Sequence, residues 1–317
     1  MLLAPPLETI TSLGCSLVIR LVEGPVALEL FLSCQPGSGT ETTDQATAAW
    51  KAILEFLQSK GGSYSNVITE TTFLGDHSDI EHIRAARARV LSEMAAPAHR
   101  PSRTEIEQPP LNGGADLEVL VHAIIPNKPD LQLDAIDAVT NCSCFECARS
   151  HGLLVRQGGE NRLFTGGLYG AGKTAYEQTS AMFEVAEKLL QQAGMEFSDV
   201  MRTWIYFPEM ERDYAGFNRA RREFFESRGV DPIPASTGIG AGLVPEEHDL
   251  LLGFYAVKGS TPTARTVMTT PTLNEAPDYG SDFSRGMRVE EANRTSLHIS
   301  GTASIDETGE TVHLDDI

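Results

Sequence analysis

The chain has 317 residues, of which 41% are hydrophobic and 22% are charged, a composition typical of globular proteins and not of disordered ones. Its formal net charge of −19 argues against nucleic acid or an anionic membrane as the main partner, because both require a basic surface. No stretch approaches the ~20 apolar residues of a membrane span, and residues 1–14 lack the basic start of a signal peptide. The odd number of cysteines, five, fits a reducing cytoplasm, so we expect a cytoplasmic protein.

The predicted elements follow one order twice along the chain. The first half predicts a short apolar strand at 31–34, an amphipathic helix over 46–60, a strand over 67–74, a helix over 79–91, and strands over 103–107 and 117–125. The second half predicts the same elements at 164–167, 179–193, 200–207, 213–225, 235–243 and 250–257. Gly61 and Gly194 end the first helix of each half as C-caps. With further strands at its start, each half reads β-β-β-α-β-α-β-β.

The two halves align without gaps at an offset of 133 residues. The matched pairs are Phe31 with Phe164, Gln45 with Gln178, Trp50 with Phe183, Leu57 with Leu190, Gly61 with Gly194, Val67 with Val200, and Phe73 with Tyr206. Such self-similarity is typical of repeated modules, and it argues against two unrelated α+β domains.

A third copy begins near the end of the chain. Residues 297–301 resemble 162–166 at an offset of 135, and the chain stops at Ile317, where the next helix is expected. We therefore predict a module at 1–130, a linker at 131–149, a module at 150–260 and an incomplete module at 270–317. Because half a module leaves a sheet edge uncovered, we expect a fragment, or a strand pair completed by another chain.

The second copy resembles the RidA/YjgF superfamily. The resemblance rests on Gln178, the Ala-Gly end of the helix at 193–194, Asp199-Val200, Phe217-Asn218, and Pro-Ala-Ser-Thr at 234–237. It implies an α+β fold of tandem modules, each with a mixed six-stranded sheet and two helices on one face. It also implies a trimer-like barrel of three sheets, formed between modules or in a homo-oligomer, with small-molecule sites in the clefts between neighbours.

Within this superfamily, the chain is most similar to the chorismatase branch. The similar segments are 202–206, 234–240, 279–285 and 299–305, whereas an additional module at 1–130 departs from that branch. The resemblance implies cleavage of the enol-pyruvyl ether of chorismate by protonation and water attack, without a cofactor. It places the acid–base carboxylate beyond Ile317. The alternatives are an enamine or imine deaminase of the RidA type and a non-catalytic ligand-binding or scaffold protein.

The deaminase alternative depends on an arginine on the fifth strand and a glutamate on the sixth. The arginine position holds Ser236 in the second module and Arg103 in the first, and the glutamate position holds Gly253 and Leu120. Arg103 is thus either a clamp for a substrate carboxylate or an exposed arginine on an edge strand. Neither module carries the complete pair, which argues against imine hydrolysis within this chain.

Other candidate binding residues lie in the second half. Asn218 either donates to a ligand or caps its own helix, whereas Arg219, Arg221 and Arg222 are expected on a solvated helix face. The turn at Ser300, Gly301 and Thr302 offers N–H and hydroxyl groups to an anion, with Tyr279 and Arg285 on the preceding hairpin. The expected ligand is therefore a small metabolite that carries carboxylates. The alternative is that these residues only form ordinary turns, in which glycine and serine are common.

Two further motifs contain residues of the kind found in metal or nucleotide sites. Cys142, Cys144, Cys147 and His151 supply four possible zinc ligands, but their spacing is not that of a standard knuckle, so we predict reduced thiols and no metal. The segment 167–174 has the spacing of a phosphate-binding loop, but the RidA resemblance around it predicts a glycine-rich hairpin instead.

Overall fold

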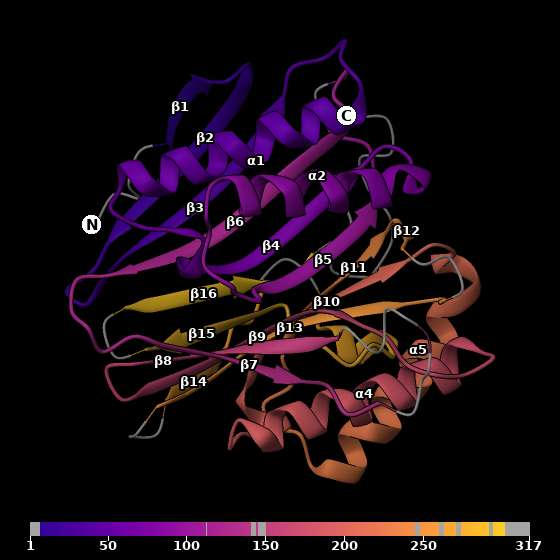
Figure 1. Cartoon of the computed structure of the whole chain (residues 1–317). Coiled ribbons are helices and arrows are strands. Elements are labelled where there is room, and N and C mark those ends of the chain that lie inside the picture. Colours follow the sequence, from indigo (N-terminus) through magenta and orange to yellow (C-terminus); the bar gives the residue numbers. More distant parts are fainter. Residues whose placement is uncertain are drawn as a thin grey trace. The chain divides into compact units, whose positions relative to one another are not determined.

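The structure is a computed structural model of the chain (Figure 1). It describes residues 7–111, 113–140, 144, 150–244, 248–259, 263–270, 274–291 and 294–301, with the side chains of Asp278 and Tyr279 left out. The chain forms two compact units, which are described separately. The first unit comprises Met1–Leu131 with Ala241–Glu246, and the second comprises Gln132–Gly240 with Glu247–Ile317.

The first unit contains a seven-stranded mixed sheet. Its strands, in sheet order, are β1 (Leu7–Ser12), β2 (Cys15–Glu23), β3 (Ala27–Pro36), β6 (Leu117–Pro126), β4 (Val67–Leu74), β5 (Ser102–Glu107) and β12 (Gly242–Leu243). The strands β4 and β5 run parallel, so their carboxyl ends lie at one edge, and the other neighbours are antiparallel.

Two helices, α1 (Thr42–Ser59) and α2 (Ile80–Glu93), pack together on one face of this sheet (Figure 1). The apolar stripe of α1, including Trp50, Ile53 and Leu57, is buried in the core. Gly61 follows the helix with a φ of +78°, a left-handed conformation that favours glycine, so the predicted C-cap is present. Short 3₁₀ turns, η1 (Tyr64–Asn66) and η2 (His77–Asp79), precede β4 and α2.

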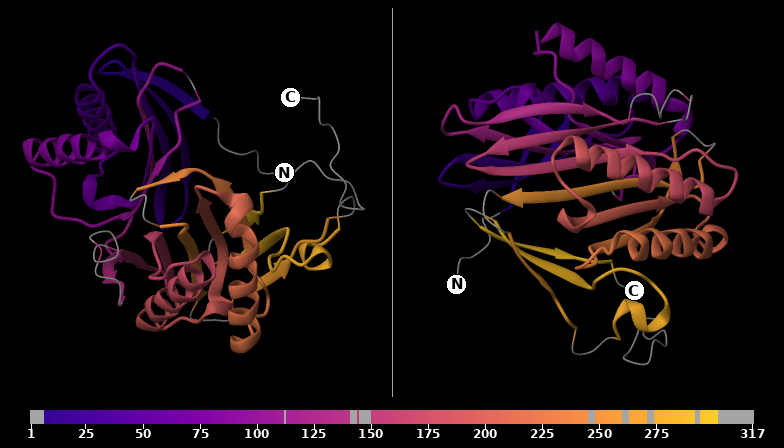
Figure 2. Two further views of the ribbon diagram at one scale, coloured as in Figure 1. Left: turned by 90° about the vertical axis from the view of Figure 1, so that its right-hand side faces the viewer. Right: turned by 90° about the horizontal axis from the view of Figure 1, so that it is seen from below.

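The second unit repeats this plan with a six-stranded sheet. Its strands, in sheet order, are β11 (Ala235–Gly240), β10 (Val200–Phe207), β13 (Leu251–Gly259), β9 (Glu160–Leu168), β8 (His151–Gln157) and β7 (Gln132–Asp137). The helices α4 (Ala175–Gln192) and α5 (Met210–Arg228) pack against each other on one face (Figure 2). The turn η3 (Phe197–Asp199) precedes β10.

A separate three-stranded antiparallel sheet completes the described part of the second unit. It is formed by β14 (Ala264–Val267), β15 (Gly286–Glu290) and β16 (Thr295–Ile299), with the turn η4 (Ala276–Tyr279) before β15. The order repeats β7-β8-β9, as expected for the start of a third module. Its strands lie against β10 and β11, and Ser236 N donates to Ser300 Oγ at 2.8 Å. The sheet edge at β11 is therefore covered.

The predicted order β-β-β-α-β-α-β-β is confirmed in both units, and the strands predicted at 67–74 and 200–207 match β4 and β10 residue for residue. Two details differ. The first sheet has seven strands, not six, because the strand predicted over 235–243 divides, and β12 pairs with β5. Part of the linker predicted at 131–149 is β7, an edge strand that pairs with β8 along its whole length.

The trimer-like barrel stays a prediction. None of the helices in the described part of the chain combines the length and the apolar composition needed to cross a bilayer.

Candidate functional site

One predicted residue of the second unit, Arg285, lies near the ring of Phe283, together with Arg221, which was not predicted as a site residue. Arg221, from α5, and Arg285, at the start of the hairpin, both lie near this ring, with Cζ 5.8 Å and 5.7 Å from its centroid. Both arginines are buried, each with 3% of its surface exposed. Two guanidinium groups thus lie near one aromatic ring in the interior, which is unusual because buried charge requires compensation.

Arg221 corrects a prediction, because we expected it on a solvated helix face. Its guanidinium lies 4.7 Å from the ring centroid of Phe217, and Nη2 donates to Asn218 Oδ1 at 2.6 Å. Its Nε is buried and has no hydrogen-bond partner among the described residues. Burial lowers the pKa of Arg221 to about 10, so it is still cationic at neutral pH. The unused donor and the buried charge suit an anionic ligand.

Arg285 is anchored by the backbone. Its Nε and Nη2 donate to the carbonyl oxygen of Asn274 at 3.1 and 2.9 Å, and its own carbonyl accepts from Ser300 N at 2.9 Å. These contacts orient the side chain. Asn218, predicted as a ligand donor, acts in this structure as the acceptor that positions Arg221.

Contacts from α5 hold the segment that carries Phe283. Arg222 pairs with Asp282, with Nε 3.2 Å from Oδ2, and also donates to the carbonyl of Gly280. Tyr214 Oη lies 3.3 Å from Ser281 Oγ. These contacts fix the position of the Phe283 ring relative to Arg221.

The predicted turn at Ser300 and Gly301 has a different role in the described residues. Ser300 Oγ donates to the Ser284 carbonyl at 2.5 Å, and Gly301 N donates to Thr237 Oγ1 at 2.7 Å. A Cβ at Gly301 would lie 2.5 Å from Thr237 Cγ2, so only glycine fits this approach. Ser300 N donates to the Arg285 carbonyl within the hairpin, and Gly301 N links the hairpin to β11, so both N–H groups already have acceptors. Thr302 and the side chain of Tyr279 lie outside the described residues.

Sequence reasoning did not single out Arg202 as a site residue, although it lies in one of the chorismatase-like segments. It is 7% exposed, stacks over Trp204 with Cζ 5.2 Å from the ring centroid, and donates to Thr237 Oγ1. Its Nη1 is buried without a partner among the described residues, and burial lowers the pKa of Arg202 to about 10. The Arg-x-Trp spacing on a strand, which places both side chains on one face, is the signal that indicates this pair.

Arg103 lies in the first unit, on β5. Its Nη1 is 3.8 Å from Glu105 Oε1, and Glu105 also accepts from Arg84 Nε at 3.0 Å. The register pairs Arg103 with the buried Glu70 on β4, so the side chain lies among carboxylates of its own unit. These neighbours compete for the charge that a clamp for a substrate carboxylate would need.

The structure describes part of the cysteine motif. Cys144 Sγ lies 3.4 Å from His248 Nε2, His151 is buried on β8, and Cys142 and Cys147 lie outside the described residues. The prediction of no zinc at these cysteines therefore stays open.

The segment 167–174 is packed against the first turns of α4. A Cβ at Gly170 would lie 1.9 Å from the Gln178 carbonyl oxygen, and Thr174 Oγ1 caps the helix by accepting from Glu177 N. Glu177 Oε2 also accepts from Lys173 N at 2.8 Å. A loop that lies this close to its helix, with a glutamate at its tip, does not form a phosphate cradle.

Comparisons with known proteins agree with this architecture. The family model described as Endoribonuclease L-PSP matches residues 32–125 and 154–257. A RutC family protein in the leuC 5′ region of Leuconostoc mesenteroides subsp. cremoris is 24% identical over 88 residues, which cover 28% of this chain and 67% of that protein.

Two solved structures are similar to this chain over different shares of its length. A chorismatase crystal structure matches with a TM-score of 0.56 and 14% identity, covering 79% of this chain and 80% of that one. A member of the YjgF/YER057c/UK114 family from Mycobacterium tuberculosis is 22% identical and covers 39% of this chain and 98% of that one, with a TM-score of 0.31. The match to the chorismatase is a likeness of fold that extends over most of both chains.

Proposed function

Because the chain belongs to the Endoribonuclease L-PSP family, the RidA/YjgF family of the resemblance, we propose that it binds a small carboxylate-bearing metabolite around Phe283 and acts on it as a chorismatase-like enzyme. The observation that carries this proposal is the pair of buried guanidinium groups, Arg221 and Arg285, whose Cζ atoms lie 5.8 Å and 5.7 Å from the centroid of one aromatic ring.

The chemistry of the pair suits a ring with two carboxylates. Each guanidinium can donate to a carboxylate, and the aromatic ring of Phe283 offers an apolar surface to a cyclic ligand. In a protein with a net charge of −19, a dianion binds only where cationic groups act locally against the overall field. Arg221 fits this requirement, since its Nε has no partner among the described residues.

The proposed reaction is cleavage of the enol-pyruvyl ether of chorismate. A proton adds to the methylene carbon of the enol ether, water attacks the resulting cation, and the ether bond breaks to release pyruvate and a cyclic diol. The two arginines would orient the substrate carboxylates; no acid or base is assigned among the described residues. The step needs water and no redox cofactor.

Calorimetry with chorismate tests the binding part. Arg221→Met and Arg285→Met, which keep an apolar stem and remove the charge, are each expected to weaken binding by roughly 10- to 150-fold, corresponding to the 1.5–3 kcal/mol of a charge-assisted hydrogen bond. Arg219→Met is the matched control, because Arg219 is exposed on the same helix. Unchanged affinity in both test variants would remove these arginines from the site.

Release of pyruvate from chorismate tests the reaction. Binding without pyruvate release would favour the ligand-binding alternative. Turnover of an imino acid without chorismate binding would favour the deaminase alternative, although Ser236 and Gly253 occupy the positions of its two functional residues.

A further inference from the structure

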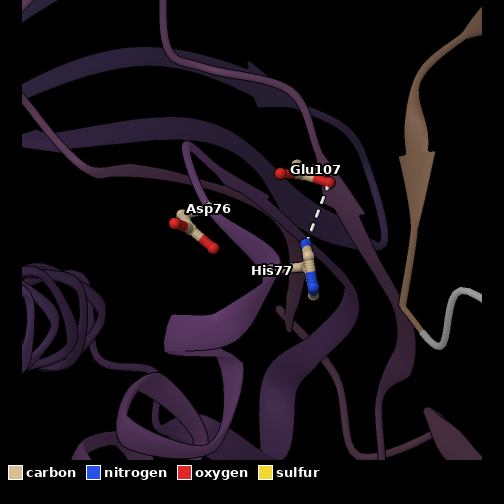
Figure 3. A group of neighbouring side chains, drawn as sticks. All are labelled: Asp76, His77 and Glu107. Atoms are coloured by element: carbon tan, nitrogen blue, oxygen red, sulfur yellow. Dashed lines mark hydrogen bonds and ion pairs between the residues drawn. The ribbon is translucent and has the colours of Figure 1, made fainter.

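A cluster of metal-ligating side chains lies in the first unit and shares no residue with the site proposed above. The parallel strands β4 and β5 end at the same sheet edge, with Leu74 paired to Glu107. The chain leaves β4 through Gly75 and continues into Asp76 and His77. Figure 3 shows these two side chains on the loop after β4 and Glu107 at the end of β5. The topology thus brings one imidazole and two carboxylates together.

The distances suit a shared ion. One ligand atom from each of Asp76, His77 and Glu107 lies within 4.8 Å of the others, and His77 Nδ1 is 3.3 Å from Glu107 Oε2 (Figure 3). Metal–nitrogen and metal–oxygen bonds of about 2.0–2.2 Å place neighbouring ligand atoms about 3–3.5 Å apart. The pair formed by His77 and Glu107 already has that separation, and a ligand oxygen of Asp76 lies within 4.8 Å of both.

The backbone around the cluster is fixed. Gly75 N donates to the Asp116 carbonyl at 2.8 Å, and Gln108 N donates to the Leu74 carbonyl at 2.9 Å, so both strand ends are held. Asp76 Oδ1 accepts from Ser78 N at 2.8 Å, which orients this carboxylate.

The neighbouring strand β12 limits the space available to the Glu107 side chain. Gly242 on β12 pairs with Glu107, and a Cβ at Gly242 would lie 2.6 Å from Glu107 Oε2. A larger residue would displace the carboxylate. Glycine at this position therefore leaves Glu107 free to stay beside His77 at the sheet edge.

The surroundings suit a hydrated cation. Asp76 is exposed, and the side chains of His77 and Glu107 are 40% and 32% exposed, so water can complete a coordination shell. Two more acidic residues come from adjoining backbone, since Asp79 belongs to the turn that begins at His77 and the Asp116 carbonyl accepts from Gly75 N. The local charge is therefore negative in a protein that is already strongly anionic.

The cluster is specific to the first unit. At the offset of 133 residues, the second unit has Glu209, Met210 and Gly240 in place of Asp76, His77 and Glu107. Met210 packs against the apolar core of its unit, whereas His77 faces a carboxylate. The ligand set is thus not a requirement of the module fold.

We propose that Asp76, His77 and Glu107 bind a divalent first-row transition ion, with Zn²⁺ as the reference ion. An imidazole nitrogen favours such ions over Ca²⁺ and Mg²⁺, which prefer oxygen ligands alone. Three protein ligands leave a coordination position for water. This proposal departs from the expectation of no metal that was drawn from the sequence, and it is independent of the proposed function.

The test uses the full chain, freed of metal by a chelator, in a calorimetric titration with Zn²⁺. One equivalent is expected to bind, and His77→Gln and Glu107→Gln are each expected to weaken binding by at least about tenfold, since even indirect ligand contacts have effects of that size. His82→Gln is the matched control, because His82 is a nearby exposed histidine outside the cluster.

The cysteines are a second possible zinc site, so the titration is repeated with Cys144→Ser. Binding that survives Cys144→Ser and is lost in His77→Gln supports the proposal, as does bound Co²⁺ without thiolate-to-metal charge-transfer absorption. Absence of binding, binding unaffected by both His77→Gln and Glu107→Gln, or binding lost in Cys144→Ser would overturn it. Circular dichroism of each variant shows that the fold is retained.

Discussion

The interiors of the two units differ in chemistry at equivalent positions. In the first unit, Glu70 is 2% exposed, and Arg87 donates to its carboxylate through Nε at 2.6 Å and Nη2 at 3.0 Å. Tyr64 Oη also donates to Glu70, at 2.9 Å, and the guanidinium of Arg87 lies 5.2 Å from the ring centroid of Trp50. Burial, together with the Glu70 charge, raises the pKa of Tyr64 well above its usual value.

In the second unit, the same four positions hold Thr203 for Glu70, Ala220 for Arg87, Phe197 for Tyr64 and Phe183 for Trp50. Phe183 is the centre of an aromatic cluster there, and its ring centroid lies 5.7 Å from that of Phe197 and 5.3 Å from that of Phe224. One backbone plan thus accepts either a buried ion pair or an aromatic core. The comparison teaches that the ion pair is a local solution of the first unit and not a condition of the fold.

The largest expected effect comes from breaking the ion pair. Arg87→Met leaves the Glu70 carboxylate buried without its partner, so we expect the first unit to lose about 3–5 kcal/mol in free energy of unfolding. Urea unfolding followed by Trp50 fluorescence in a Trp204→Phe background reports this unit alone, because the chain has only two tryptophans.

A combined variant sharpens the comparison. Tyr64→Phe, Glu70→Leu and Arg87→Met together replace the network with apolar groups, as in the second unit, and should recover at least half of the loss. If the triple variant is as unstable as Arg87→Met, the ion pair is required by the fold, and our interpretation of the two cores is wrong.

The next effect concerns the aromatic core. Phe183→Leu removes part of a buried ring, and we expect a loss of roughly 1–3 kcal/mol in the second unit, since large-to-small changes lose burial and packing. Trp204 fluorescence in a Trp50→Phe background measures it. A loss of stability larger than that of Arg87→Met would show that the aromatic core contributes more to stability than the ion pair does.

A smaller effect depends on pH. Burial lowers the pKa of His298 to about 4 from 6.5, and its Nε2 has no hydrogen-bond partner among the described residues. Between these values the unfolded state binds more protons, so the contribution to stability is present above pH 6.5 and is lost as the pH falls towards 4. We expect roughly 1–2 kcal/mol, discounted for partial exposure. The free energy of unfolding should differ less between pH 7 and pH 4.5 in His298→Phe than in the wild type. An equal difference would show that His298 does not cause the pH dependence.

The smallest effect is expected for Arg103→Ala. The ion pair of Arg103 with Glu105 is long, at 3.8 Å, so stability should change by no more than about 0.5 kcal/mol. Chorismate affinity should also stay unchanged, in contrast to Arg285→Met. A tenfold loss of affinity in calorimetry would restore Arg103 as the carboxylate clamp.

The sequence predicted those parts of the fold that depend on local patterns. Alternating apolar residues located β4 and β10, and the offset of 133 residues showed that the modules repeat. The addition of β12 to the first sheet was not predicted. The pairing of Gly242 with Glu107 is a contact between residues far apart in the chain, which local patterns do not indicate.

The site was predicted only in part, for the same reason. Arg285 was identified through the family resemblance, whereas Arg221 was placed on a solvated face because arginine is seldom buried. Its spacing of four residues from both Phe217 and Phe225 indicated the apolar stripe of the helix. Its full burial also depends on Phe283, which comes from a segment about sixty residues later and has no local signal in the helix.

The central claim is that the second unit, not the first, carries the ligand site. Hydrogen exchange measured by mass spectrometry, with and without chorismate on the full chain, tests it most directly because it locates binding along the sequence. Our account predicts slower exchange in α5 and in residues 280–286, and unchanged exchange in α2 and β5. Slower exchange in α2 and β5, with none around Phe283, would contradict it.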